Sequence, residues 1–159
     1  MFLEYHNLGR PFESYSQAQL LIGMCMDNRK HLTMPENFAY IVRSAGANLR
    51  YSEFKVSFAI GVGGVSHIAL IGHTQCRMEN LAAKKDLFVK GLVKRAGWNK
   101  KDATEHFLNF CMMFETGQIE KFILSEAQRL QARFPKITVV PMLYKVEDGR
   151  IYLLREIIK

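Results

Sequence analysis

Two short segments of the sequence contain residue types that bind metals, and each segment follows an apolar run. Cys25, Asp27 and Arg29 lie in the first segment, and His73 and Cys76 lie in the second. Two thiolates and one imidazole form a ligand set that suits zinc, which they would hold in a tetrahedron. Because three protein ligands leave the fourth position open, the pattern is typical of a catalytic zinc rather than a structural one.

The His-x-x-Cys spacing of the second segment lets both side chains turn toward one ion from the end of a strand. We expect Cys76 to lie in the first turn of a helix, where the helix N-terminus would favour a thiolate. The third cysteine, Cys111, lies in an apolar helical stretch and is predicted to be a core residue. An odd number of cysteines argues against a disulfide framework.

The carboxylate of Asp27 and the guanidinium of Arg29, both near Cys25, have two interpretations. As neighbours of a metal, Asp27 and Arg29 could handle a proton on whatever occupies the fourth ligand position. The alternative is a plain salt bridge that caps a turn.

The hydrophobic pattern predicts strands that alternate with helices. Strands are expected at residues 20–24, 38–42, 67–71, 137–144 and 151–154, and helices at 52–62, 78–96 (in two pieces), 101–114 and 119–134. Residues 1–18 are expected to form an arm or a short helix. This order indicates an α/β domain with a mainly parallel sheet, in which the last strand is an antiparallel edge strand.

Parallel sheets bind ligands at the carboxyl ends of their strands. Cys25 and His73 both come directly after predicted strands, so they converge on one site if those strands are neighbours. In the predicted helix at 52–62, Phe54, Phe58 and Val62 share one face, which we expect to be buried.

Length and composition fit one soluble domain over residues 1–159, of which 48% are hydrophobic and 23% charged. The N-terminal residues do not resemble a signal peptide, and no apolar run is long enough to span a bilayer, so we expect a cytoplasmic protein. The net charge of +7 is spread over polar stretches without a nucleic-acid-binding motif. We therefore expect neither a nucleic-acid nor a membrane partner.

The pattern Cys-x-Asp-x-Arg, followed by Gly-His-x-x-Cys at a strand end, resembles the β-class carbonic anhydrases. Three further segments resemble parts of that family, namely residues 41–48, the glycine turn at 61–65 and the closing hairpin at 144–154. The resemblance implies a Rossmann-like sheet of four parallel strands plus one antiparallel edge strand, flanked by helices. It also implies a homodimer or a multiple of dimers.

The resemblance further implies reversible hydration of carbon dioxide to bicarbonate by a zinc-bound hydroxide, with Cys25, His73 and Cys76 as the ligands of Zn²⁺. Asp27 and Arg29 would be the catalytic pair, and Asp27 would become a fourth ligand in a closed state. Two residues of the matching loop, Ala45 and Gly46, are candidates for substrate binding.

Two departures from the family pattern leave other functions open. Arg77 stands where the family usually has glycine, and we expect it to modulate anion binding near the metal. The segment 30–40 is shorter than the family's segment that borders the entrance. The alternatives are hydrolysis of a similar linear molecule, carbon disulfide or carbonyl sulfide, and a non-catalytic zinc- or bicarbonate-binding module.

Overall fold

The computed structural model describes residues 1–155, so residues 156–159 of the predicted domain lie outside the described part. Five strands form one sheet in the order β2-β1-β3-β4-β5, in which β5 alone is antiparallel to its neighbour. The strands are β1 (Leu20–Cys25), β2 (Ala39–Ser44), β3 (His67–His73), β4 (Thr138–Lys145) and β5 (Arg150–Leu153). The predicted fold class, four parallel strands and an antiparallel edge strand flanked by helices, is confirmed.

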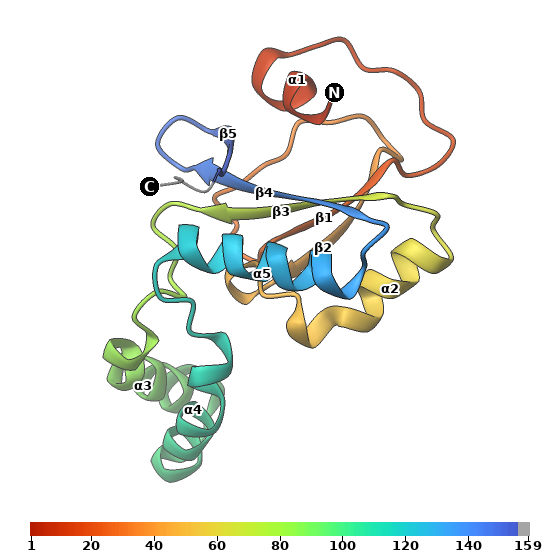
Figure 1. Cartoon of the computed structure of the whole chain (residues 1–159). Helices are drawn as coiled ribbons and strands as arrows, with labels where there is room; N and C mark the ends of the chain where they lie inside the picture. The colour runs from red at the N-terminus through yellow and green to blue at the C-terminus, as the bar shows by residue number, and fades with distance from the viewer. Residues whose placement is uncertain (156–159) are drawn as a thin grey trace.

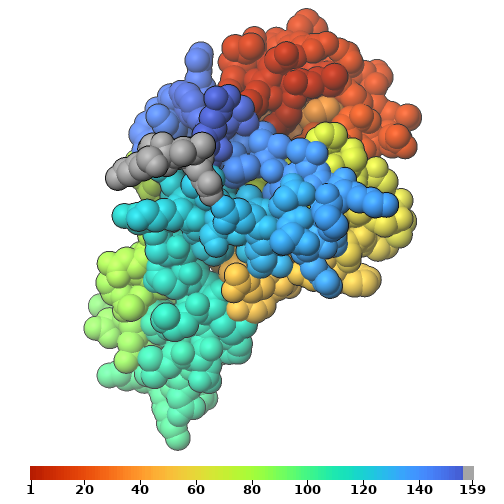
Figure 2. Space-filling model, viewed as in Figure 1, coloured from red at the N-terminus to blue at the C-terminus, as the bar shows by residue number. Residues whose placement is uncertain are grey.

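Helices lie on both faces of the sheet. They are α1 (Phe2–Leu8), α2 (Glu53–Gly61), α3 (Lys85–Ala96), α4 (Lys100–Phe114) and α5 (Ile119–Arg133), with short 3-10 turns η1 (Ala45–Ala47), η2 (Arg50–Ser52) and η3 (Leu81–Lys84). Helices α2 and α5 cover one face, and α1 lies on the opposite side (Figure 1). The pair α3–α4 projects from the body of the molecule, and Figure 2 shows it as a separate extension.

The core follows from the alternation of side chains along the strands. In β1, Leu20, Ile22 and Met24 belong to the apolar cluster that includes α1, whereas Leu21 belongs to the cluster that includes α5. Gly23 brings the loop after β2 close to β1, because a Cβ there would lie 2.6 Å from Leu49 Cδ1. The core therefore has two layers, one on each face of the sheet, and Cys25 at the end of β1 belongs to the layer that includes α5.

The prediction of a buried face on the helix near 52–62 was wrong. Phe54, Phe58 and Val62 are 80%, 50% and 72% exposed, and the side chains of α2 that pack inward are Val56 and Ala59. Helical periodicity identifies an apolar face but does not say which surface covers it. We call Phe54, Phe58 and Val62 the α2 stripe.

The prediction that Cys76 lies in the first turn of a helix was also wrong. Residues 77–80 form turns, and regular α-helix starts only at Lys85, after the 3-10 turn η3. Gln75 and Asn80 both have positive φ values, 56° and 53°, which interrupt helical geometry on either side of the turns. Cys76 therefore has no helix N-terminus beside it.

Within residues 1–155, no helix is both long and apolar enough to cross a membrane.

Candidate metal centre

Three side chains that can bind a metal meet at the carboxyl end of the sheet. Cys25 ends β1, His73 ends the neighbouring strand β3, and Cys76 lies in the loop after it. The ligand atoms of these residues all lie within 4.8 Å of one another, and all three residues are buried. The structure thus brings together the three side chains that the sequence suggested as ligands.

The orientation of His73 suits a metal ligand. Its Nδ1 lies 2.8 Å from the carbonyl oxygen of Thr74, which can only accept a hydrogen bond, so Nδ1 carries the proton. Nε2 then presents a lone pair, and this buried atom has no hydrogen-bond partner among the described residues. A metal ion between Nε2 and the two sulfur atoms would satisfy it, so the residues present fit zinc.

The two thiols affect each other's protonation. The pKa of Cys25 is lowered, first because the Cys76 thiol donates a hydrogen bond to its sulfur, and further by the backbone amides of Asp27 and Gly46. The pKa of Cys76 is raised by the same contact and by burial. The shared hydrogen bond therefore favours ionisation of Cys25 over Cys76, and a bound cation would favour the thiolate of both.

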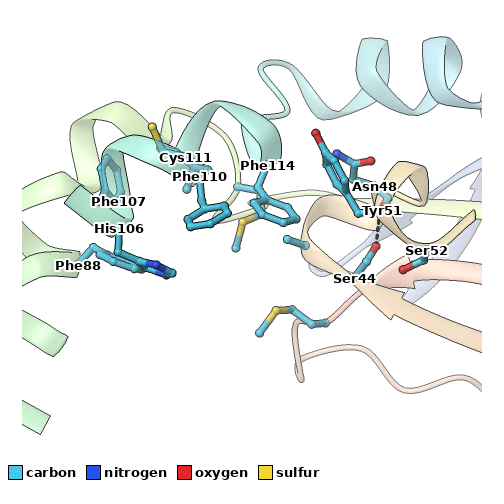
Figure 3. Close-up of a pocket in the computed structure, with 14 residues that line it drawn as sticks. Ser44, Asn48, Tyr51, Ser52, Phe88, His106, Phe107, Phe110, Cys111 and Phe114 are labelled. Atoms are coloured by element: carbon cyan, nitrogen blue, oxygen red, sulfur yellow. Dashed lines mark hydrogen bonds between the residues drawn. The ribbon is translucent and has the colours of Figure 1, made fainter. Parts of the chain in front are cut away.

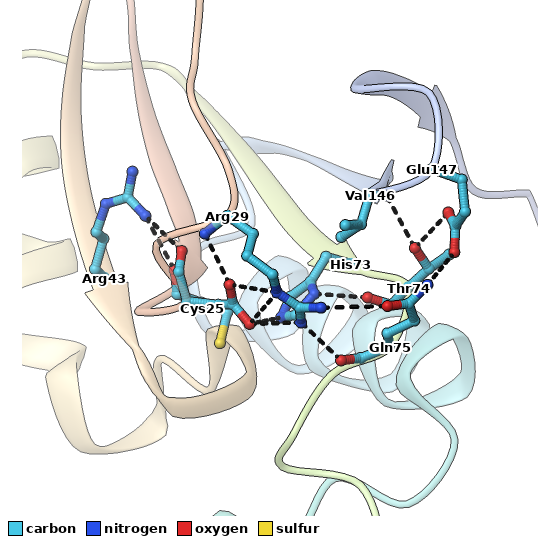
Figure 4. Close-up of polar contacts among 9 residues, drawn as sticks. Cys25, Arg29, Arg43, His73, Thr74, Gln75, Val146 and Glu147 are labelled. Carbon is cyan, nitrogen blue, oxygen red and sulfur yellow. Dashed lines mark hydrogen bonds and ion pairs between the residues drawn. The ribbon is translucent and has the colours of Figure 1, made fainter.

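Arg29, which lies beside Cys25 and His73 (Figure 4), forms an ion pair with Asp27. Arg29 Nη2 donates to Asp27 Oδ2 at 2.7 Å, and Arg29 Nε and the Arg29 backbone amide donate to Oδ1 at 3.0 and 2.9 Å. The Arg29 guanidinium holds the pKa of the Asp27 carboxyl well below its usual range. Asp27 Oδ2 lies 4.0 Å from His73 Nε2, so an ionised carboxylate faces the metal position.

A network from the β4–β5 turn holds the loop that contains Cys76. Glu147 accepts hydrogen bonds from Thr74 Oγ1 at 2.7 Å and from Gln75 Nε2 at 2.9 Å. The carbonyl of Gln75 in turn accepts from Arg29 Nη2 at 2.9 Å. Hydrogen bonds therefore connect the loop both to the Asp27–Arg29 pair and to the β4–β5 turn.

The other candidate residues lie around this centre and line two neighbouring cavities. Arg77 lines a cavity of about 340 Å³ together with Cys25, Asp27 and Arg29. Gly46 is buried with its amide directed at Cys25, while Ala45 lines a larger neighbouring cavity. Cys111, predicted to be a core residue, is only half-buried and lines that larger cavity too.

Two cations near the site were missed by sequence reasoning. Arg43 Nη1 lies 3.3 Å from the Cys25 carbonyl and 3.4 Å from the Asp27 carbonyl, so it braces the loop between them. Lys30 is 1% exposed, and its Nζ has no hydrogen-bond partner among the described residues. Burial lowers the pKa of Lys30, and the charges of Cys25 and Asp27 oppose that shift. A lysine in a polar stretch gives no sign of burial in sequence alone.

Fold and site together define a Rossmann-like α/β protein with a buried Cys-His-Cys cluster at the carboxyl ends of its parallel strands. Solved structures with this fold include a β-carbonic anhydrase from Trichomonas vaginalis, with a TM-score of 0.72 and 17% identity over 92% of this chain and 88% of that chain. A carbonic anhydrase from Streptococcus mutans has a TM-score of 0.67 and 18% identity, over 94% and 90% of the two chains. A carbon disulfide hydrolase has a TM-score of 0.62 and 20% identity, over 89% and 81%.

Neither a family model nor a curated protein matches the sequence. The chain nevertheless has the fold of the β-carbonic anhydrases, as the spacing of its motifs predicted.

Proposed function

We propose that this protein is a zinc-dependent carbonate dehydratase, which reversibly hydrates carbon dioxide to bicarbonate. The observation that carries the proposal is the buried cluster of Cys25, His73 and Cys76, with the unpartnered His73 Nε2, beside an ionised Asp27. Zinc bound there would supply a water acidic enough to act as hydroxide near neutral pH. The products are bicarbonate and one proton, which leaves to solvent or buffer.

The protein's own residues would orient this reaction. Asp27 offers a carboxylate oxygen that accepts a hydrogen bond from the attacking oxygen and so directs its lone pair at carbon dioxide. Arg29 keeps Asp27 ionised and donates to both of its carboxylate oxygens, which supports an open arrangement over one in which Asp27 is itself a ligand. Arg77 adds a positive charge to the wall of the same cavity, where it would favour anions such as bicarbonate.

The proposal is tested by stopped-flow hydration of carbon dioxide with the zinc-loaded protein. Asp27→Asn should lower kcat by about a hundredfold or more, because an amide cannot replace a carboxylate as proton acceptor. Asp148→Asn, an exposed acid on the β4–β5 turn, serves as the matched control and should leave the rate unchanged. One bound zinc per chain without hydration at neutral to mildly alkaline pH would contradict the proposal and favour a zinc- or bicarbonate-binding module.

Hydrolysis of carbon disulfide or carbonyl sulfide is the second candidate. It is favoured by the solved structure of a carbon disulfide hydrolase among those with this fold. Both molecules are linear and uncharged like carbon dioxide, so the same centre would act on them. Release of hydrogen sulfide by the zinc-loaded protein distinguishes this activity from hydration.

We also propose that the protein is a homodimer of single-domain chains in a reducing compartment, the cytoplasm. The three free cysteines support the reducing compartment. The α2 stripe supports the dimer, because three large apolar side chains on one helix face are exposed in the isolated chain.

A further inference from the structure

A second, larger cavity lies beside the metal centre. It has a volume of about 610 Å³ and is lined by residues of α3 and α4, by the segment from Ser44 to Ser52, and by Met26, Met78 and Leu81. Phe107 and Phe110 of α4 lie across the cavity from Ser52, whereas Phe114 contacts Tyr51, with ring centroids 5.4 Å apart (Figure 3). The projecting helix pair α3–α4 therefore borders a cavity that opens to solvent, since Phe110 and Tyr51 in its lining are 43% and 50% exposed.

The wall of this cavity does not suit a charged ligand. None of the described residues that line it is a lysine, arginine, aspartate or glutamate, although 23% of the chain is charged. Two of its polar side chains are already engaged, since Ser44 Oγ donates to the Asn48 carbonyl at 2.9 Å and Asn48 Nδ2 donates to the Met113 carbonyl at 3.0 Å. The other polar side chains of the lining are those of Tyr51, Ser52 and His106, so the wall offers few hydrogen-bonding groups to a ligand.

The wall does suit aromatic rings. His106 packs among rings, with ring centroids 4.9 Å from Phe110 and 6.1 Å from Phe88. A further aromatic ring in the cavity would find faces and edges at the same kind of spacing, which aromatic pairs prefer.

The cavity adjoins the metal centre. Met26 and Met78 line both this cavity and the smaller one that contains Cys25 and Asp27. Methionine side chains are flexible and adapt to a ligand, so these two form a movable partition.

We propose that this cavity binds an uncharged aromatic molecule directly beside the metal centre. A triatomic molecule such as carbon dioxide does not need a cavity of this size. A water molecule occupies about 30 Å³ in the liquid, and the cavity is about twenty times larger. Its volume falls in the range of pockets that enclose small organic ligands. The proposal goes beyond the proposed function, because binding in the cavity requires neither the metal nor catalysis.

The test is a titration of the full chain with toluene, followed by NMR of ¹³C-labelled methionine methyl groups. We expect saturable shifts of the Met26 and Met78 signals, with and without zinc. Met142, buried in the cluster that includes α1, is the internal control and should not respond. A chain that binds toluene but does not hydrate carbon dioxide would support this proposal and contradict only the proposed function.

Two matched variants on α4 locate the binding site. Phe110→Asp places a carboxylate in the wall and should raise the half-saturating toluene concentration at least about tenfold. Leu108→Asp places the same charge on an exposed position of the same helix, outside the cavity. This variant should leave the half-saturating toluene concentration unchanged. Both positions are exposed enough to accept a polar residue without unfolding, which a thermal melt checks.

Three results would overturn the proposal. One is the absence of saturable shifts, and another is equal toluene binding in Phe110→Asp and the unmodified chain. The third is a toluene-independent change of the Met26 and Met78 signals on dilution of the protein, which would assign the cavity to a second copy of the chain.

Discussion

The three residues that could hold a metal are kept in place by different means. Cys25 and His73 are the last residues of paired strands, so the sheet fixes their backbone. Cys76 lies in a loop that is held by side chains, through Gln75 and Thr74 to Glu147. Substitution of Cys76 therefore tests metal binding with little effect on the sheet.

Cys76→Ser should lose zinc, because a hydroxyl is a much poorer zinc ligand than a thiolate. We expect zinc affinity to fall at least about tenfold in competition with a chelator. Cys111→Ser is the control, since Cys111 lies on α4 outside the cluster, and it should retain one zinc per chain. Equal zinc content in both variants would refute the ligand assignment.

Lys30 is expected to reduce the stability of the fold. An ammonium that is 1% exposed and has no hydrogen-bond partner among the described residues is costly to bury. Lys30→Met keeps the shape of the side chain and should raise the free energy of unfolding of the metal-free protein by about 1–3 kcal/mol at neutral pH. Lys101→Met, at a side chain that is 83% exposed, should change it little.

The pH dependence gives a second readout for Lys30. Because its pKa is lower in the folded than in the unfolded chain, the unfolded chain binds more protons between the two pKa values. The contribution of Lys30 to the free energy of unfolding therefore increases as the pH rises toward the pKa of an ordinary lysine. Lys30→Met should remove this pH dependence. Urea unfolding at several pH values measures both the unfolding free energy and its pH dependence. A less stable Lys30→Met variant would contradict the prediction that burial of the Lys30 ammonium is unfavourable.

At the scale of elements, the turn η1 shapes the floor of the site. Gly46 in this turn has a φ of 61°, and a Cβ at this position would clash with the Thr116 methyl group. The left-handed conformation directs the Gly46 amide toward Cys25. Glycine at this position is thus required by backbone conformation and by packing together.

Gly46→Ala should destabilise the protein by about 2–5 kcal/mol, as the sum of left-handed strain and overpacking. Gly64→Ala separates the two effects, because Gly64 has a similar φ of 70° but no atom near the position of a Cβ. Gly64→Ala should lower the free energy of unfolding by only about 1–2 kcal/mol. Denaturant unfolding compares the two variants, and equal losses would show that Thr116 moves aside freely.

The strands were predictable because they are short apolar runs that end at turn signals. The meeting of Cys25 and His73 was predictable for the same reason, since this cysteine and this histidine stand where two such runs stop. The loop of Cys76 was not predictable, because it depends on Glu147, which is distant in sequence and close in space. The burial of Lys30 and the exposure of Phe54 likewise depend on tertiary packing, which local pattern does not contain.

At the scale of the whole molecule, the α2 stripe leaves Phe54, Phe58 and Val62 uncovered in the isolated chain. Phe54→Asp should weaken self-association at least about tenfold, because a carboxylate would be buried without a partner in an apolar interface. Leu8→Asp, on α1 and 73% exposed, is the matched control and should keep the dimer. Sedimentation velocity measures both, and a monomeric unmodified protein would exclude a dimer through this helix.

The tie between Glu147 and the Thr74–Gln75 loop has a consequence for synthesis on the ribosome. Strand β3 pairs with β4, and the amide of Thr74 donates to the carbonyl of Tyr144 at 3.0 Å. A nascent chain that has emerged only as far as α5 contains the three side chains that could bind a metal and the contact of Arg29 with Gln75, but it lacks β4 and Glu147, the other supports of the Cys76 loop. We therefore expect the complete chain to bind zinc more tightly than incomplete translation products do.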